Sequence, residues 1–191
     1  MCCFSLSIAP VHAGAQAEEK LSASVQTALA SAIADRSAPK LIGDPKEMQP
    51  WLAEMSSRLV KRIPDAEQRT EFLVTVQYEA SRAGLDPQLM LAVINHESAF
   101  RKYAISSASA RGYTQVMPFW VKLIGAPEHN LFHLRTNLRY GCVILRHYLD
   151  IEKGDVVRAL ARYNGSLGKF DYPNAVLSLQ ENRWKWVAPN P

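Results

Sequence analysis

Glu97 is the acidic residue of this 191-residue chain whose position best fits a chemical role. It follows Met90, Val93 and Ile94 by seven, four and three residues, a spacing that puts the four side chains on one face of a helix. Burial on that face disfavours the charged form of the carboxyl group and raises its pKa, and the carbonyl end of a helix acts in the same direction. A carboxylic acid that keeps its proton near neutral pH can act as a general acid.

Other interpretations of this region lead to different predictions. The same spacing also fits a half-exposed glutamate at a helix end. His96-Glu97 resembles the start of a zinc-binding helix motif, but that motif needs a second histidine at position 100, which is Phe100. His129 and His133 have the required spacing but no acidic residue beside them, so a solvated or core role is expected. We therefore predict no metal and no cofactor.

Nucleophilic serine chemistry is not indicated either. The only glycine-flanked serine of note lies in Asn164-Gly165-Ser166-Leu167-Gly168, which has the wrong spacing for a nucleophile elbow. No glycine-rich phosphate loop is found. What remains is a carboxylic acid acting on an acetal, which is the chemistry of a glycosidase.

A second catalytic carboxylate, which ordinary glycosidases use, is not apparent. Asp86 is better explained as a helix cap, because Pro87 follows it. The acids after Glu97 all fall in polar or loop contexts: Glu128, Asp150, Glu152, Asp155, Asp171 and Glu181. One acid suffices if the substrate supplies its own nucleophile.

The elements that must position Glu97 are predicted to be helices, so the fold class is all-α. Apolar residues recur at helical spacing, and no window shows the strict alternation of a strand. The helix that carries Glu97, residues 88 to 98, is apolar almost all round and should be buried. Further helices are expected at 19–36, 47–63, 66–83, 114–124, 131–152, 155–164 and 173–187. A small hairpin near 103–113 is also compatible with the pattern.

The chain divides into three predicted parts. Residues 1–17 carry no Asp, Glu, Lys or Arg and contain a short apolar run, which indicates a signal peptide although a basic start is missing. Small-x-small sites end at Ala13 and Ala17, and we expect cleavage after Ala17. Residues 18–65 form a helical N-terminal extension, and residues 66–191 form the catalytic domain.

Cysteines and charge add weaker constraints. Cys142 is the one cysteine left after such cleavage and lies in an apolar stripe, so a buried structural thiol is expected. The net charge of +4 and the pI near 9.0 come without a lysine-rich run. This is poor support for nucleic-acid binding and is equally compatible with an acidic polymer such as cell-wall glycan.

Four segments together resemble the catalytic domain of the soluble lytic transglycosylase (SLT, lysozyme-like) family, over about residues 70 to 187. Their order and spacing make the set specific. They are Glu97-Ser98-Ala99-Phe100, the stretch Ser106 to Pro118 with Gly112-Tyr113-Thr114-Gln115-Val116-Met117-Pro118, Asn137-Leu138-Arg139-Tyr140-Gly141, and Ala159-Leu160-Ala161-Arg162-Tyr163-Asn164.

The resemblance implies that Glu97 is the sole acid and base and that Tyr163 faces its carboxyl group. The implied substrate-binding residues are Ser106, Gln115, Met117, Tyr163 and Asn164. Three departures from the family pattern touch the cleft wall and one loop: Tyr113-Thr114 replaces Leu-Met, Ser109 replaces a glycine, and residues 165–168 differ. They affect the expected sugar preference more than the chemistry.

Structural roles compete with these assignments. Met117 fits a core position, Asn164 fits a helix C-cap, and Tyr163 lies on an apolar stripe that should pack its ring. For Trp184 and Trp186 we expect packing against the domain rather than sugar stacking.

The resemblance implies a lytic transglycosylase that cleaves the β-1,4 bond between N-acetylmuramic acid and N-acetylglucosamine of peptidoglycan without consuming water. The product would carry a 1,6-anhydromuramoyl end. A goose-type lysozyme that uses water for the second step, and a non-catalytic peptidoglycan-binding protein of the same fold, are the alternatives. The expected location is the periplasm or cell envelope of a Gram-negative bacterium. The expected partners are peptidoglycan strands, with cell-envelope proteins as further candidates, and we expect no nucleic acid and no transmembrane segment in the mature chain.

Overall fold

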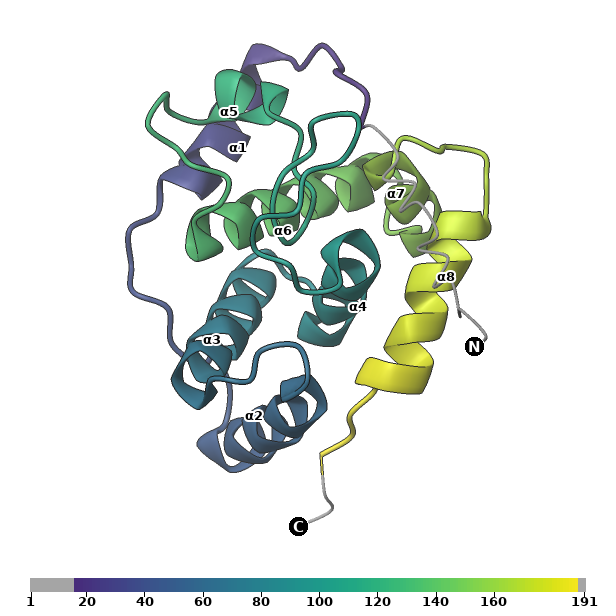
Figure 1. Ribbon diagram of the computed structural model, residues 1–191. Helices are drawn as coiled ribbons and strands as arrows, with labels where there is room; N and C mark the ends of the chain where they lie inside the picture. The colour runs from purple at the N-terminus through teal and green to yellow at the C-terminus, as the bar shows by residue number, and fades with distance from the viewer. Residues whose placement is uncertain (1–15, 189–191) are drawn as a thin grey trace, which may run out of the picture.

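The computed structural model describes residues 16–188, which form an all-α fold (Figure 1). The predicted signal peptide lies outside the described residues except for its last two positions. The elements are α1 (Ala23–Ala34), α2 (Pro45–Leu59), α3 (Ala66–Arg82), α4 (Pro87–Ser98), α5 (Phe119–Ile124), α6 (Leu134–Ile151), α7 (Val156–Tyr163), α8 (Asp171–Leu179) and the π-helical turn η1 (Gln180–Trp184). Within the described range, no helix is long and apolar enough to span a membrane.

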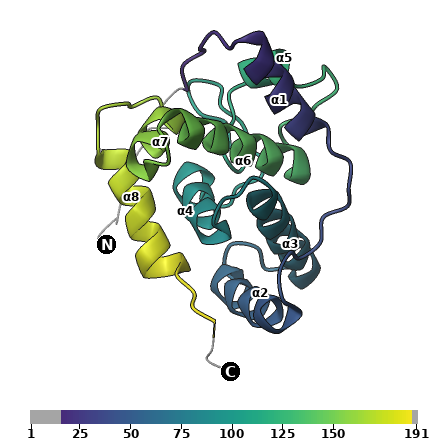
Figure 2. The ribbon, with the colours of Figure 1, turned by 180° about the vertical axis from the view of Figure 1, so that it is seen from behind.

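Helix α4 lies at the centre of the molecule, with α3, α6 and α8 around it in both views (Figures 1 and 2). As predicted, it starts at an Asp86 cap, whose side chain accepts a hydrogen bond from the Gln88 backbone N–H at 2.8 Å. Every residue from Leu89 to Ile94 is buried. Because these six consecutive residues are shielded from water on every side, the position of the helix is set by packing on all faces.

Two predicted helices differ most from the observed bounds, while others, such as those expected at 19–36 and 47–63, differ by up to four residues at one end. The helix expected at 114–124 covers only Phe119–Ile124, because residues 111–116 form two isolated antiparallel bridges and Gln115 has a φ of +49°. The bridges, Ile105 with Arg111 and Arg111 with Val116, make the hairpin-like loop that the pattern also allowed. The helix expected at 173–187 starts earlier, at Asp171, and passes into η1, beyond which the chain is extended from Lys185.

The N-terminal helices share the core of the catalytic region. Trp51, Met55 and Leu59 are buried along one face of α2, which packs on α3, and Ile33 of α1 belongs to the same apolar cluster. Arg139 of α6 donates hydrogen bonds to the backbone carbonyl groups of Ile33 and Asp35. These contacts tie residues 33–59 to the helices that surround α4.

A buried ion cluster joins α3 to α6. The side chain of Glu79 is 1% exposed and pairs with Arg82 at 3.1 Å, Arg135 at 2.9 Å and Arg139 at 3.0 Å. A carboxylate removed from water needs such partners, and breaking a buried pair leaves uncompensated charge. Glu79 is thus the centre on which three arginines depend.

We expect Glu79→Gln to lower the free energy of unfolding by about 3 kcal/mol, because it leaves the largely buried guanidinium group of Arg139 without a carboxylate partner, whereas Arg82 and Arg135 keep Asp35. The control is Glu54→Gln, which removes a partly exposed pair with Arg58 on α2 and should cost less than about 1 kcal/mol. Urea denaturation of both variants measures the two costs. Equal costs would contradict a buried role for Glu79.

Candidate active site

Glu97 lies in the last turn of α4 with its side chain turned into the protein, and the residue is 4% exposed. The helix ends abruptly after it, because Ala99 and Phe100 have φ angles of +49° and +65°. Residues with a side chain rarely adopt this left-handed conformation, so the surrounding packing must hold it. The ring of Phe100 supplies that packing, edge-on to Phe72 at 5.8 Å and Trp184 at 5.3 Å between centroids.

The direct partner of the carboxyl group is Tyr172, near the start of α8. Its hydroxyl donates a hydrogen bond to Oε1 of Glu97 at 2.6 Å, and both groups are buried. The Tyr172 ring also packs edge-on against His96, with 4.8 Å between centroids. Consecutive residues at the end of α4 therefore hold one tyrosine in place.

Burial raises the pKa of Glu97 from 4.5 to about 7, while the hydrogen bond from Tyr172 opposes this rise. The sequence predicted the direction of this change and its main cause. The pKa of Tyr172 is itself raised well above its ordinary value, by burial first and then by the neighbouring charge of Glu97. At neutral pH the site thus holds a carboxyl group balanced between its two protonation states.

Tyr163, at the end of α7, also lies close enough for the charge of Glu97 to raise its pKa, although burial contributes more. Its hydroxyl does not donate to Glu97. It donates to the backbone carbonyl oxygen of Thr114 at 2.7 Å. The tyrosine that the resemblance placed against the carboxyl group therefore lies near it but contacts the loop, whereas Tyr172 contacts the acid.

Asn137 on α6 organises the loop that carries Thr114. Its Oδ1 accepts from the Thr114 backbone N–H at 2.9 Å, and its Nδ2 donates to the carbonyl oxygens of Arg111 at 2.8 Å and Leu131 at 2.9 Å. Gly112 allows this approach, because a Cβ atom there would lie 2.4 Å from Nδ2 of Asn137. One fully buried amide thus fixes the loop to α6.

The structure places the other predicted residues around this loop. Ser106 accepts a hydrogen bond from the Ala110 backbone N–H at 3.1 Å. The side-chain amide of Gln115 donates to the carbonyl oxygens of Gly112 at 2.9 Å and Ala104 at 3.2 Å, so its donors serve the loop.

Met117 and Asn164 are the remaining predicted residues. Met117 is half-buried and packs against the core. Asn164 caps α7, as its competing structural role predicted, but its buried Nδ2 has no hydrogen-bond partner among the described residues. A buried donor without an acceptor is costly.

Several predicted structural roles are confirmed. Cys142 is buried, and burial raises the pKa of its thiol well above the ordinary value. Trp184 is fully buried and Trp186 is partly buried against the core. His129 shares a 2.8 Å hydrogen bond with the Tyr140 hydroxyl, while His133 precedes α6 as its N-cap.

Tyr172 is the site residue that the sequence analysis missed. The predicted helix began one residue after it, which left Tyr172 in a loop. The available signal was its spacing of four residues from Val176, which gives a buried face on α8. A buried tyrosine needs a partner for its hydroxyl, and a buried glutamate is an obvious one.

Comparison with known proteins identifies the family. A family profile described as "Transglycosylase SLT domain" matches residues 75–175, more than half of the chain. The chain belongs to the SLT transglycosylase family. Membership confirms the resemblance and the lysozyme-like all-α fold, and the matched range contains Glu97, Asn137, Tyr163 and Tyr172.

Two curated relatives are similar to parts of this chain. A transglycosylase of Enterobacteria phage PRD1 is 31% identical over 98 residues, which cover 51% of this chain and 36% of the phage protein. A membrane-bound lytic murein transglycosylase C of Actinobacillus pleuropneumoniae serotype 5b (strain L20) is 44% identical over 48 residues, 25% of this chain and 13% of that protein. The chain thus spans about a third or less of these relatives.

We call residues 105–117, the loop that Asn137 fixes to α6, the SLT loop. It gives a prediction for Gly112, whose φ is +75° and where a Cβ atom would also lie 2.6 Å from the Leu131 carbonyl oxygen. The matched control is Gly84, which has a φ of +65° and nothing within 4 Å of such an atom. We expect Gly84→Ala to cost about 1 kcal/mol of unfolding free energy through backbone strain alone. Gly112→Ala should cost at least about 2 kcal/mol more, because the collision adds overpacking. Chemical denaturation compares them, and equal losses would contradict the close approach of Asn137.

The buried acid gives a second prediction. Its folded pKa of about 7 exceeds the ordinary 4.5, so its contribution to stability is complete below pH 4.5 and is lost as pH rises through 7. Relative to wild type, Glu97→Gln should gain about 3 kcal/mol of unfolding free energy between those pH values. Tyr172→Phe removes the hydrogen bond that favours the charged form of Glu97, so the pH midpoint at which Glu97 loses its proton should move above that of wild type. Denaturation at a series of pH values measures the stability of both variants relative to wild type. A difference between Glu97→Gln and wild type that does not change with pH would show that Glu97 is not buried.

Proposed function

We propose that this protein is a peptidoglycan lytic transglycosylase in which Glu97 is the sole acid and base. Membership of the SLT family supports the class of activity. The observation that carries the proposal is the buried carboxyl group of Glu97, with its pKa of about 7 and its hydrogen bond from Tyr172. A group half protonated at neutral pH can give a proton in one step and accept one in the next.

In the first step, Glu97 protonates the glycosidic oxygen that links N-acetylmuramic acid to the next N-acetylglucosamine. The acetamido oxygen of the muramoyl residue assists by forming a bond to C1 as the C1–O bond breaks. In the second step, the Glu97 carboxylate removes the proton from the muramoyl 6-hydroxyl as that oxygen bonds to C1 and displaces the acetamido oxygen. The sugar ends as a 1,6-anhydro ring, and Glu97 recovers its proton.

The electrostatics of the site favour this route over hydrolysis with two carboxylates. Glycosidases of that kind hold their two acids roughly 5 to 9.5 Å apart, where each changes the pKa of the other. Within the described residues, burial and Tyr172 are the causes that act on the pKa of Glu97, and no acidic neighbour is among them. The muramoyl 6-hydroxyl would therefore take the role that an activated water has in a goose-type lysozyme.

The remaining site residues are proposed to hold the glycan. Tyr163 fixes the Thr114 carbonyl group and so the loop of Gln115 and Met117, which would form one wall of the sugar cleft. Asn164, the C-cap of α7, would contribute to the same cleft, as the family resemblance implies. Ser106 would bind near the scissile bond, as the family resemblance implies.

The substrate implies a location. We propose that the protein is exported by the predicted signal peptide to the periplasm or cell envelope, where peptidoglycan strands are its partner. The name of the Actinobacillus relative describes a membrane-bound murein enzyme, which agrees with action at the envelope.

The products of digestion test the reaction. Purified peptidoglycan treated with the protein should release muropeptides with 1,6-anhydromuramoyl ends, detectable by mass spectrometry. Products heavier by one water, with reducing ends, would instead assign the protein as a hydrolase. Release of no products by a well-folded protein would favour the peptidoglycan-binding alternative.

The matched control is Glu97→Gln, which keeps the shape of the side chain but cannot transfer a proton. Loss of general acid and base catalysis costs on the order of 100- to 10,000-fold, and because one group serves both steps, the loss should reach at least the upper end. Its melting temperature at neutral pH should equal or exceed that of wild type. Retained activity in a folded Glu97→Gln protein would overturn the assignment.

A further inference from the structure

The short segment that precedes α1 is packed into the catalytic region. We call residues 16–19 the N-terminal strap. Gln16 is 4% exposed, and its Oε1 accepts a hydrogen bond from the indole Nε1 of Trp120 at 2.9 Å. The same oxygen lies 3.5 Å from the backbone nitrogen of Met117. The strap therefore contacts the end of the SLT loop and the first turn of α5.

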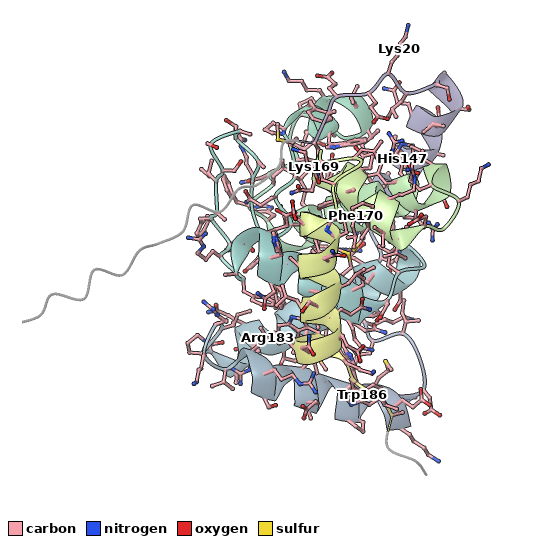
Figure 3. All side chains as sticks on the ribbon, turned by 90° about the vertical axis from the view of Figure 1, so that its right-hand side faces the viewer. Lys20, His147, Lys169, Phe170, Arg183 and Trp186 are labelled. Carbon is pink, nitrogen blue, oxygen red and sulfur yellow. The ribbon has the colours of Figure 1, made fainter. Side chains whose placement is uncertain are left out.

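The other end of the strap reaches α7. Glu19 pairs with Arg162 at 2.8 Å, and Arg162 also pairs with Glu152 at 2.6 Å. Arg162 immediately precedes Tyr163 of the proposed site. Figure 3 shows Lys20, the residue after the strap, at the same upper end of the molecule as His147 of α6. Four residues thus bridge two segments that carry site residues.

The two contacts of the strap, Glu19 with Arg162 and Gln16 with Trp120, contribute differently to stability. The Glu19 side chain is 38% exposed, so its ion pair with Arg162 is worth little. The contact of Gln16 is buried. Trp120 is 2% exposed, and Gln16 is the acceptor for its indole N–H. Because a buried N–H group without an acceptor costs stability, Gln16 is a structural part of the domain.

This observation bears on where the leader ends. Cleavage after Ala17 would remove Gln16 and uncover the indole N–H of Trp120. Cleavage at the upstream small-x-small site, Val11-His12-Ala13, would keep the whole strap. Both sites have the small-x-small residues that signal peptidase accepts, so the requirement of the fold distinguishes them.

We propose that the mature protein retains Gln16 as the buried cap of Trp120, and that the leader is removed after Ala13. The mature chain then begins at Gly14, four residues upstream of the start that the sequence alone favoured. This proposal rests on the export that forms part of the proposed function. The stability of the strap, however, is measured without any activity.

The first experiment expresses the full chain in a Gram-negative host and determines the mass and N-terminal sequence of the protein from the envelope fraction. A chain that begins at Gly14 supports the proposal. A chain that begins at Glu18 overturns it while leaving export intact. A chain that keeps Met1 overturns both the processing and the signal peptide.

The second experiment compares the melting temperatures of chains that start at Gly14 and at Glu18. Loss of one buried hydrogen bond should lower the melting temperature of the shorter chain by about 2–4 °C. Gln16→Ala in the longer chain should reproduce most of this loss. Equal melting temperatures for all three proteins would overturn the structural role of Gln16.

Gln26→Ala is the matched control. Gln26 also links the N-terminal region to α5, through a 2.6 Å hydrogen bond to the Leu123 carbonyl oxygen, but this bond is exposed and water can replace it. Gln26→Ala should leave the melting temperature within about 1 °C of that of the parent chain.

A double-mutant cycle completes the test: in a Trp120→Phe background, which lacks the indole N–H, Gln16→Ala should have little further effect. Full additivity would show that the two side chains do not interact.

Discussion

The architecture depends on keeping one carboxyl group out of water at the end of an apolar helix. A buried carboxylate is costly, and burial alone would raise the pKa of Glu97 further than is observed. The 2.6 Å hydrogen bond from Tyr172 favours the charged form and limits the rise in pKa, which leaves a value of about 7. The placement of α8, which carries Tyr172, is therefore part of the chemistry of a residue on α4.

A second requirement is that irregular backbone near this acid be satisfied without water. Residues 111–114 turn back beneath α6, where their N–H and carbonyl groups need partners. The side chain of Asn137 supplies two of these hydrogen bonds, to Thr114 and Arg111, and also bonds to Leu131, while Tyr163 supplies a third to the Thr114 carbonyl group. Polar groups in a core are destabilising unless they are hydrogen-bonded. The network is satisfied because α6, α7 and the loop, three separate segments, meet at one point.

Local pattern was sufficient to predict some of these features and insufficient for others. The burial of Glu97 followed from its spacing to Met90, Val93 and Ile94, because helical periodicity is a local property. The Tyr172 contact joins residues 75 positions apart and depends on how α8 crosses α4, which no spacing encodes. The expected helix over 114–118 failed for a related reason. Those residues lack local helix breakers before Pro118, but their hydrogen bonds to α6 and to Arg111 fix them in a loop.

The strap shows the same limitation at the N-terminus. Gln16 has no distinctive local pattern, and the small-x-small rule treated it as part of a leader. Its contact with Trp120 spans 104 positions in the sequence and becomes visible only in the folded chain.

The SLT match itself does not delimit a unit that could fold alone. The matched range begins at residue 75, within α3, and ends at residue 175, within α8. A chain cut at these points would lose Phe72, which packs on Phe100 directly after Glu97, and Trp184, which packs on the other side of the same ring. Both neighbours support the left-handed backbone of Phe100, together with the backbone hydrogen bonds of Ala99 and Arg101. The strained turn that ends α4, and with it the position of the acid, is therefore maintained by residues on both sides of the region that defines the family.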